Sequence, residues 1–371
     1  MKGFFSAVCV LLLAACSSPS GPKPAELPAL DAPKQVRVLW SAQVGSAERF
    51  AFSPALVGDA VYAAARDGTV TRLDAANGAQ RWRESTDRKL SGGVGADART
   101  VAVATEEGEV IALDAATGKP RWRARVSSEV LAAPAVGQGL VVVRSLDNRV
   151  FAFGEEDGKR RWVYQRAAAS LIVRSPAGVT LSGDTAFAGF SGGKLAAIAL
   201  SSGNLLWEAT VALPRGATEL ERVTDVVGEP AVQGREVCAA AYQGRVACYE
   251  AASGRQIWGR ELSSLTGLSL DARYAFVSDE RGTVHALDRT NGRSIWKQDR
   301  LAYRQLSVPA GAGNALAVGD LEGYVHFLSR ESGAFVGRYA TGGGAVRVPP
   351  AAVPSGVLVQ TQDGGLYALA P

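Results

Sequence analysis

The residues with the most capacity for chemistry in this sequence are its histidines, cysteines and regularly spaced aspartates. There are two histidines, His285 and His326, and each lies three residues after a turn glycine. An imidazole can bind a metal or transfer a proton. However, the same place in other copies of one repeat is held by Thr71, Ile111 and Phe151. The repeat therefore explains the position of both histidines without a metal site.

The other polar residues form no known catalytic motif. The sequence contains no HExxH, CxxC, P-loop or nucleophile-elbow pattern. Its acidic residues fall at the same turn of successive repeats, as Asp74, Asp114 and Asp288 do, which keeps them apart. We expect these aspartates, with the Thr-Gly that follows, to cap the backbone of that turn. The sequence thus predicts no catalytic residue, no metal site and no cofactor.

The cysteines differ in their expected roles. Cys9 lies in the N-terminal targeting segment, and Cys238 and Cys248 flank a turn at Gln243-Gly244. A two-residue turn would place Cys238 opposite Tyr249 and Cys248 opposite Ala239, so that the two side chains point to opposite faces. The sequence therefore favours two small buried thiols. A disulfide between them would need a different register.

The first residues have the pattern of a targeting segment. Lys2 precedes an apolar run, Phe4 to Leu13, which is too short to span a membrane in the mature protein. The sequence Leu-Ala-Ala-Cys at 13–16 resembles the bacterial lipobox, which implies a signal peptide over 1–15 and a lipid on Cys16. A cleaved secretory peptide is the alternative. Residues 16–35, rich in Ser, Pro, Gly and Ala, predict a flexible lipidated tether.

One repeat organises the remaining chain, residues 36–371. Its clearest copy is EGEVIALDAATGKPRW, from Glu107 to Trp122: a turn glycine, an alternating strand, an Asp, a Thr-Gly turn and a Trp. Aligned copies account for all seven tryptophans, which are Trp40, Trp82, Trp122, Trp162, Trp207, Trp258 and Trp296. In one further copy Gly337 holds the Trp place. Periods near forty residues with strand-like alternation are typical of a β-propeller.

The two ends of the chain predict how this ring closes. A last copy begins at Asp363-Gly364 and stops before its outer strand, whereas residues 35–40 form a strand that ends in Trp40. We therefore predict an all-β, eight-bladed propeller of four-stranded antiparallel blades, closed by pairing the N-terminal strand with the C-terminal blade. Closure leaves no open sheet edge at the seam. The net charge of +4, without long basic runs, does not indicate nucleic-acid binding.

The pattern A-L-D-A-x-T-G-x-x-x-W resembles the tryptophan-docking blades of quinoprotein alcohol dehydrogenases, the PQQ-like repeat superfamily. The resemblance covers about residues 36–371 and implies the propeller fold. It also raises an alternative function, that of a PQQ-dependent periplasmic dehydrogenase. Those enzymes carry an adjacent cysteine pair over the cofactor and a Ca²⁺ site, and this sequence has no adjacent cysteines. Fold likeness by itself does not carry the chemistry.

Function is expected where the repeat spacing breaks. The intervals from Trp162 to Trp207 and on to Trp258 are 45 and 51 residues, against 38 to 42 elsewhere. The extra residues fall at 167–176 and 213–228. Both stretches follow an outer strand and precede an inner one, so we expect them on the same rim of adjacent blades. Irregular loops on a rigid scaffold commonly bind partners, although simple tolerated insertion would give the same spacing.

The segments SLIVR, at 170–174, and GATELERVTDV, at 216–226, resemble interblade loops of the BamB family, lipoproteins of the outer-membrane β-barrel assembly machinery. The resemblance implies docking to the periplasmic POTRA domains of a BamA-like barrel subunit. Six positions match that surface or lie beside it: Leu171, Val173, Arg174, Asp225, Glu219 and Arg222. The family pattern has a second Asp where Val227 stands. We expect two apolar anchors, with Arg174 and Asp225 as charged rim contacts.

These patterns together predict a non-enzymatic scaffold lipoprotein. It would be anchored through Cys16 in the inner leaflet of the outer membrane, as the Ser17 that follows the cysteine implies by resemblance to bacterial sorting rules, and would face the periplasm. Its expected partners are a BamA-like subunit, the membrane through the lipid, and, as further candidates, unfolded outer-membrane proteins.

Overall fold

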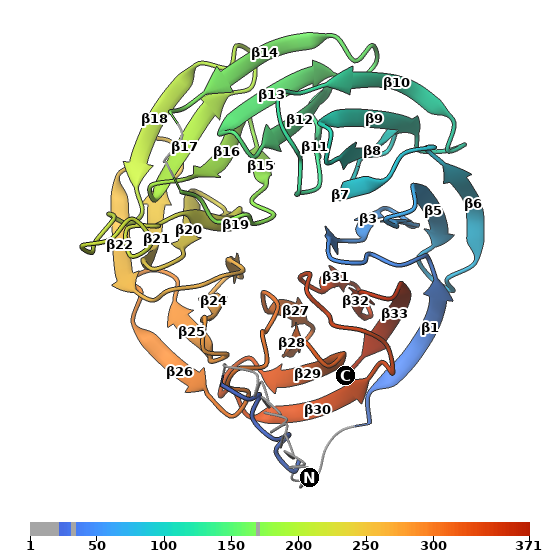
Figure 1. Ribbon diagram of the computed structural model, residues 1–371. Coiled ribbons are helices and arrows are strands. Elements are labelled where there is room, and N and C mark those ends of the chain that lie inside the picture. Colours follow the sequence, from blue (N-terminus) through green and yellow to red (C-terminus); the bar gives the residue numbers. More distant parts are fainter. Residues whose placement is uncertain (1–21, 31–34, 168–170) are drawn as a thin grey trace, which may run out of the picture.

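The computed structural model describes residues 22–30, 35–167 and 171–371. Its strands form eight sheets around a central axis (Figure 1). Each sheet has four antiparallel strands, and β2 (Ala51–Phe52) adds a short parallel strand to the second. The described residues contain no α-helix, and thus none long and apolar enough to cross a membrane. The predicted all-β, eight-bladed propeller is confirmed.

In blades 1 to 7 the chain runs from an inner strand at the axis to an outer strand at the circumference. Blade 1 consists of β3 (Ala55–Val57), β4 (Ala60–Ala64), β5 (Thr69–Asp74) and β6 (Gln80–Ser85). Blade 2 consists of β7 (Leu90–Ala96), β8 (Thr100–Thr105), β9 (Glu109–Asp114) and β10 (Pro120–Arg125). Blade 3 consists of β11 (Ala135–Gly137), β12 (Leu140–Ser145), β13 (Arg149–Gly154) and β14 (Arg160–Gln165). Blade 4 consists of β15 (Val179–Ser182), β16 (Thr185–Phe190), β17 (Lys194–Ala199) and β18 (Leu205–Thr210).

The second half of the ring follows the same order. Blade 5 consists of β19 (Val226–Gln233), β20 (Glu236–Ala241), β21 (Arg245–Glu250) and β22 (Gln256–Glu261). Blade 6 consists of β23 (Leu268–Leu270), β24 (Tyr274–Ser278), β25 (Val284–Asp288) and β26 (Ser294–Gln298). Blade 7 consists of β27 (Ala310–Ala312), β28 (Ala315–Gly319), β29 (Tyr324–Ser329) and β30 (Phe335–Ala340). Blade 8 consists of β31 (Ala351–Val353), β32 (Gly356–Gln360), β33 (Gly365–Ala370) and β1 (Arg37–Gln43).

The hydrophobic core is a ring of layers between neighbouring blades. In one such layer Ala102 and Ala104 of blade 2 pack with Val141 and Val143 of blade 3, and all four are buried. Because the middle strands are covered on both faces, they read as nearly continuous apolar runs. No blade has a core of its own, so the blades stabilise one another.

Each tryptophan fastens its blade to the next one. The indole N–H of Trp122 donates to the carbonyl oxygen of Glu155 at 2.8 Å, and its ring packs on Gly158. A Cβ at Gly158, whose φ is +64°, would lie 2.6 Å from the ring. The other six tryptophans make the same contact with the turn of the following blade. Blade 8 takes its outer strand from β1 and has no such turn, which explains Gly337 at the Trp position of blade 7.

The aspartate of that turn caps the backbone, as expected. Asp114 Oδ1 accepts hydrogen bonds from the backbone N–H of Thr117 at 2.9 Å and from its hydroxyl at 2.8 Å. These bonds lower the pKa of Asp114 below its usual value, the Thr117 hydroxyl having the largest effect. The turn residues that recur along the chain are therefore structural.

The ring closes by the predicted pairing of the two ends. Strand β1 lies antiparallel to β33, with Arg37 opposite Ala370 and Gln43 opposite Gly365. Trp40 docks on Gly78 of blade 1, and its indole N–H donates to the carbonyl oxygen of Ala75 at 2.9 Å. The last blade is thus joined to the first by the same kind of tryptophan contact that joins blades 1 to 7 in succession.

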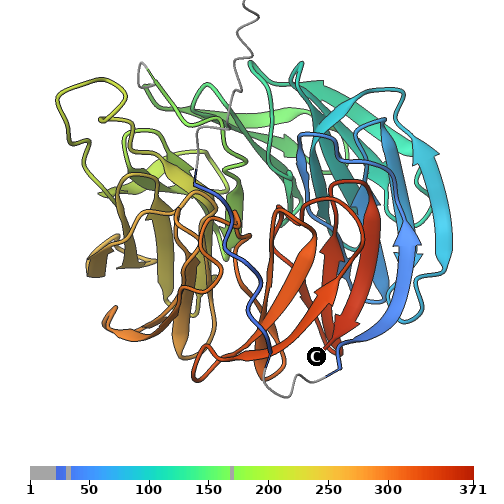
Figure 2. The same cartoon turned by 60° about the horizontal axis from the view of Figure 1, so that its bottom comes forward.

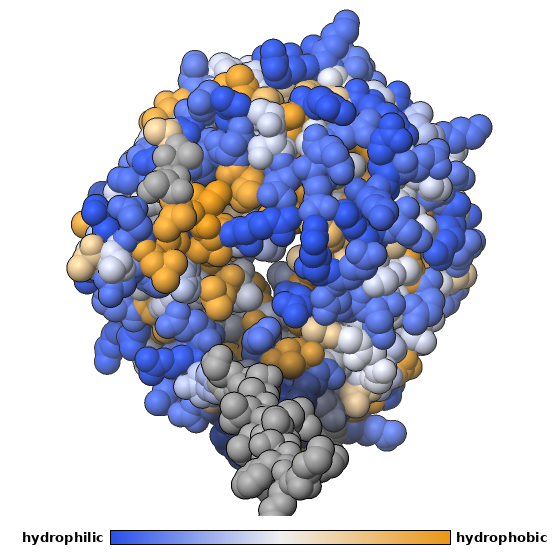
Figure 3. All heavy atoms as spheres, in the orientation of Figure 1, coloured by the Kyte–Doolittle hydropathy of each residue, from blue (hydrophilic) through white to orange (hydrophobic). Residues whose placement is uncertain are grey.

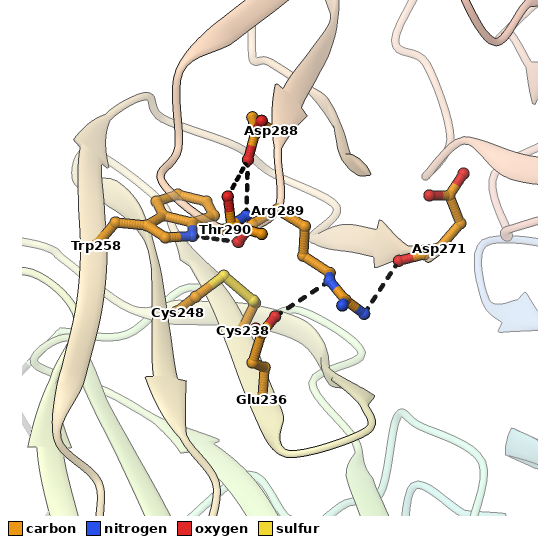
Figure 4. Close-up of a disulfide and its surroundings, with 8 residues drawn as sticks. All are labelled: Glu236, Cys238, Cys248, Trp258, Asp271, Asp288, Arg289 and Thr290. Carbon is orange, nitrogen blue, oxygen red and sulfur yellow. Dashed lines mark hydrogen bonds and ion pairs between the residues drawn. A yellow bond between two sulfur atoms is a disulfide. The ribbon is translucent and has the colours of Figure 1, made fainter. Parts of the chain in front are cut away.

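The internal cysteines form a disulfide, so the prediction of two buried thiols was wrong. Strands β20 and β21 are joined by three residues, 242–244, with Gln243 at a φ of +46°. This three-residue loop shifts the register by one and places Cys238 directly opposite Cys248 (Figure 4). Both cysteines are fully buried, and Trp258 lies opposite Cys248 on the next strand. The disulfide therefore links two strands inside blade 5.

Residues 22–30, here called the strap, lie along the outside of blades 6 and 7 (Figure 2). The backbone N–H of Ala25 donates to the carbonyl oxygen of Ala302 at 2.9 Å. Arg304 and Arg338 donate to the carbonyl oxygens of Ala25 and Pro28, at 2.9 and 3.1 Å. This differs from the flexible tether predicted over 16–35, because the bonds come from arginines about three hundred residues further along the chain.

Candidate functional site

Two long connections form the candidate site. The first loop, described from residue 171 to 178, leads from β14 to β15, and the second loop, residues 211–225, leads from β18 to β19. Each joins the outer strand of one blade to the inner strand of the next. They therefore lie on the same rim, as expected from the sequence, and Figure 2 shows this rim at the top. We call it the loop rim.

Asp225, the last residue of the second loop, joins the two loops through a hydrogen bond to the first. Its Oδ2 accepts the backbone N–H of Val173 at 2.6 Å, and its Oδ1 accepts the backbone N–H of Gly192 at 3.1 Å. Burial raises the pKa of Asp225 above its usual value, while these two bonds and the charge of Arg144 oppose the rise. Because Asp225 is 4% exposed, its predicted role as a charged rim contact was wrong. It holds the first loop against the second.

Arg174 also has partners within the chain. Its guanidinium binds Glu129, with Nη2 and Oε2 2.6 Å apart, and reaches Glu106 at 3.3 Å. The ion pair with Glu129 raises the pKa of Arg174. Glu106 in turn binds Arg66 at 2.6 Å, so a charge network links the first loop to blades 1 and 2. Arg174 is a half-exposed member of this network, and it both positions the first loop and presents charge at the surface.

The second loop is ordered by a capping box. Glu221 Oε2 accepts the backbone N–H groups of Ala217 and Thr218, at 2.9 and 3.0 Å, and the Glu221 N–H donates to the Thr218 hydroxyl at 3.2 Å. These bonds lower the pKa of Glu221. Glu221 was not among the residues predicted from the sequence, although the spacing T-x-x-E is a known signature of this arrangement. The candidates Glu219 and Arg222 lie on either side of it, and both are exposed.

Exposed leucines give the loop rim an apolar surface. Leu171 of the first loop is 45% exposed, and Leu213 and Leu220 of the second loop are 62% and 73% exposed. Leu265, on the corresponding connection of the next blade, is 47% exposed. Figure 3 shows apolar surface gathered on one side of this face. Three of these leucines were not predicted from the sequence, because exposure on a loop has no periodic signal.

Two other positions, Val173 and Val227, are less exposed than these leucines. Val173 is half-buried, held by the bond from its backbone N–H to Asp225. Val227, at the position of the second family acid, is 1% exposed and lies within β19. A carboxylate at this position would lie in the core, so in this chain the valine fits its surroundings. The surface thus consists of Leu171 and Arg174 from the first loop, together with the exposed second loop.

The chain is similar to known proteins over nearly its whole length. A family model described as "Outer membrane protein assembly factor BamB" matches residues 25–87 and 66–298. A protein of that name from Bordetella pertussis is 48% identical over 362 residues, covering 96% of this chain and 94% of the relative. Another, from Pseudomonas aeruginosa, is 46% identical and covers 96% of each chain. The chain belongs to the BamB family.

Solved structures agree with the fold of the BamB family. The crystal structure of BamB from Moraxella catarrhalis matches with a TM-score of 0.83 at 27% identity, over 91% of this chain and all of that one. A quinohemoprotein alcohol dehydrogenase from Comamonas testosteroni matches with a TM-score of 0.72, over 90% of this chain and 76% of that one. The identity to that enzyme is 13%, so the likeness shows the fold alone. Both site loops lie within the part matched by the BamB family model.

The two histidines of this BamB-family chain bind aspartates of their own blades. His285 Nε2 lies 2.9 Å from Asp279, and His326 Nε2 lies 3.0 Å from Asp320. His326 is completely buried, and its Nδ1 accepts a hydrogen bond from Arg338 Nε at 3.2 Å. Within the described residues, no three His, Cys, Asp or Glu side chains are grouped closely enough to hold a metal ion. The histidines belong to the scaffold, and His326 also supports the arginine that contacts the strap.

His326 gives stability a pH dependence. Burial lowers the pKa of His326 below its usual value of 6.5, although Asp320 opposes this. The unfolded chain therefore takes up a proton that the folded chain does not, so stability is present above about pH 6.5 and falls as the pH drops below it. We expect His326→Gln to reduce the loss of unfolding free energy between about pH 7.5 and 5.5 by roughly 1 kcal/mol, measured by denaturant unfolding at both pH values.

The matched control for this measurement is His285→Gln. His285 has the same place in the preceding blade and also pairs with an aspartate, but its ring is one blade away from Arg338 and the strap. This control is expected to change the pH dependence of stability less than His326→Gln does, because the His285 side chain is 15% exposed and the His326 side chain is completely buried. An equal effect of the two substitutions would contradict the role given to His326.

Proposed function

We propose that this chain is a non-enzymatic scaffold of the outer-membrane β-barrel assembly machinery. The loop rim would bind the periplasmic POTRA domains of a BamA-like subunit, and the bound scaffold would assist the folding and insertion of outer-membrane β-barrel proteins. The relatives named as outer membrane protein assembly factors support the assembly role. Binding at the loop rim is supported by the chemistry of that surface.

This proposal rests on one observation: the two long loops are hydrogen-bonded to each other and form a single exposed surface. Asp225 binds the backbone of the first loop from the base of the second, and Glu221 orders the tip of the second loop. Loops held in this way lose little conformational entropy when they bind a partner. Leu171, Leu213 and Leu220 provide apolar anchors, and Arg174 with its acidic partners forms a charged border, which is the usual composition of an interface.

The proposal includes a lipid anchor. Cys16 follows the small residues of a lipobox-like sequence and would carry the acyl chains that hold the protein to the inner leaflet of the outer membrane, facing the periplasm. This cysteine lies outside the described residues. Unfolded outer-membrane proteins are proposed as further, transient partners, because the outer strand of each blade has an edge that an extended chain can pair with.

The binding surface is tested with Leu171→Glu. A charge in place of a central apolar anchor is expected to weaken binding to the purified POTRA domains of the BamA-like subunit by at least about thirtyfold, which corresponds to about 2 kcal/mol. Biolayer interferometry with the immobilised POTRA domains measures the dissociation constant. The expected cause is desolvation of the carboxylate at the interface.

The matched control is Leu205→Glu. Leu205, on the outer strand of blade 4, is 46% exposed and Leu171 is 45% exposed, so the two substitutions place the same charge at equally accessible positions. The control is expected to bind normally, and both variants are expected to unfold at the same temperature as the unchanged protein. Equal affinities for the two variants would exclude the loop rim as the POTRA-binding surface.

A further inference from the structure

The strap lies in a place built to receive it. Arg304 is 2% exposed, and its three donor groups are divided among Asp320, Glu322 and the carbonyl oxygen of Ala25. Arg304 Nε lies 2.6 Å from Asp320 Oδ2. A buried guanidinium is stable only when its donors have partners. The strap carbonyl is therefore one of the partners that Arg304 needs.

A second arginine is aligned on the strap by the same network. Asp320 also binds His326 at 3.0 Å, and His326 accepts the Nε–H of Arg338. The other end of that guanidinium donates to the carbonyl oxygen of Pro28 at 3.1 Å. Two arginines, coupled through one buried aspartate, thus hold the strap backbone at points three residues apart. Five strap residues are half-buried, as expected for a segment that lies against the propeller: Pro24, Ala25, Leu27, Pro28 and Leu30.

The strap has a defined direction along the ring. Ala302, which accepts the N–H of Ala25, lies between β26 and β27, a connection from an outer strand to the next inner strand. The two site loops are connections of the same kind, so Ala25 is held at the loop rim. Strand β1 begins at the opposite rim, where Arg37 pairs with Ala370 at the end of β33. Figure 2 shows the strap running from the loop rim towards the opposite rim.

This direction decides where the N-terminal segment leaves the propeller. Cys16 is nine residues before Ala25 and 21 residues before Arg37. Nine residues span at most about 30 Å, and 21 residues at most about 70 Å. A chain held only from Arg37 would leave at the rim opposite the loops and would allow many orientations. A chain held at Ala25 leaves at the loop rim, and only nine residues then separate Ala25 from Cys16.

We propose that the strap, seated on Arg304 and Arg338, makes the lipid anchor leave at the loop rim, so that the loop rim faces the membrane. This inference rests on the anchor at Cys16 proposed above. The strap thereby presents the partner-binding loops towards the membrane in which the barrel subunit is embedded. The same residues that order the strap set the orientation of the whole propeller.

The test compares the two rims by energy transfer to lipid. The full-length acylated protein is reconstituted on vesicles of phosphatidylethanolamine and phosphatidylglycerol containing an acceptor-labelled lipid. A donor dye is attached either at Arg215→Cys, on the second loop, or at Ser201→Cys, on the turn of blade 4 at the opposite rim; both positions are exposed. Transfer from position 215 is expected to exceed transfer from position 201 at least twofold.

The strap variant replaces residues 22–30 by a Gly-Ser sequence of equal length and leaves the ring unchanged. It is expected to make the transfer from the two positions equal. Equal transfer with the natural strap, or stronger transfer from position 201, would overturn the inference. Failure of the acylated protein to bind the vesicles at all would overturn both the anchor and this inference. An unchanged POTRA affinity of the strap variant is the expected sign that orientation and partner binding are separate.

Discussion

Deletion of β1 (Arg37–Gln43) is expected to lower the free energy of unfolding by about 5 kcal/mol or more and the unfolding temperature by about 10 °C. Trp40 is 7% exposed, and its burial removes about 200 Å² from water, which corresponds to roughly 5 kcal/mol as an upper bound. The deletion also leaves β33 unpaired along its length. A loss of this size is comparable to the whole stability of many proteins.

The measurement is differential scanning calorimetry, which also reports cooperativity. The deletion is expected to broaden the transition, because blades 8 and 1 are no longer fastened to each other. Deletion of residues 22–28, which removes the same number of residues from the strap and leaves the ring closed, is the control. An unchanged melting profile after removal of β1 would show that the Trp40 contact does not close the ring.

Asp225→Ala is expected to abolish POTRA binding and to lower the free energy of unfolding by about 3 kcal/mol. The substitution leaves the partly buried N–H groups of Val173 and Gly192 without their acceptor, and leaving a fully buried donor unpaired costs about 1–3 kcal/mol. The first loop would then separate from the second. Hydrogen exchange followed by mass spectrometry is expected to show faster exchange at 171–177 and 190–193, with the rest of the ring unchanged.

The control is Asp157→Ala. Asp157 accepts the backbone N–H of Lys159 at 3.0 Å in a turn at the opposite rim, so this variant also removes a carboxylate that caps backbone. It is expected to keep POTRA binding. Weak binding by Asp225→Ala with normal exchange in both loops would mean that Asp225 contacts the partner directly. Normal binding with normal exchange would remove the role proposed for it.

The site was predictable in location but not in detail. The breaks in tryptophan spacing located both loops, because an insertion changes the length between two fixed repeat positions. The roles of individual residues depended on contacts that spacing does not report. Asp225 was expected at the surface, but the carboxylate points inward to Val173, 52 residues earlier in the chain. Arg174 was expected to be a rim charge, but it pairs with Glu129 from the preceding blade connection.

The sequence by itself determined the repeat, the number of blades and the closure of the ring. Each of these depends on a contact that recurs around the ring, such as Trp122 on Gly158, so the same residues recur in the chain. Only the tertiary structure decided the Cys238–Cys248 pairing, the burial of Asp225 and the course of the strap. Each of these occurs once. A single contact leaves no periodic pattern, and it exists only when the closed ring brings distant residues together.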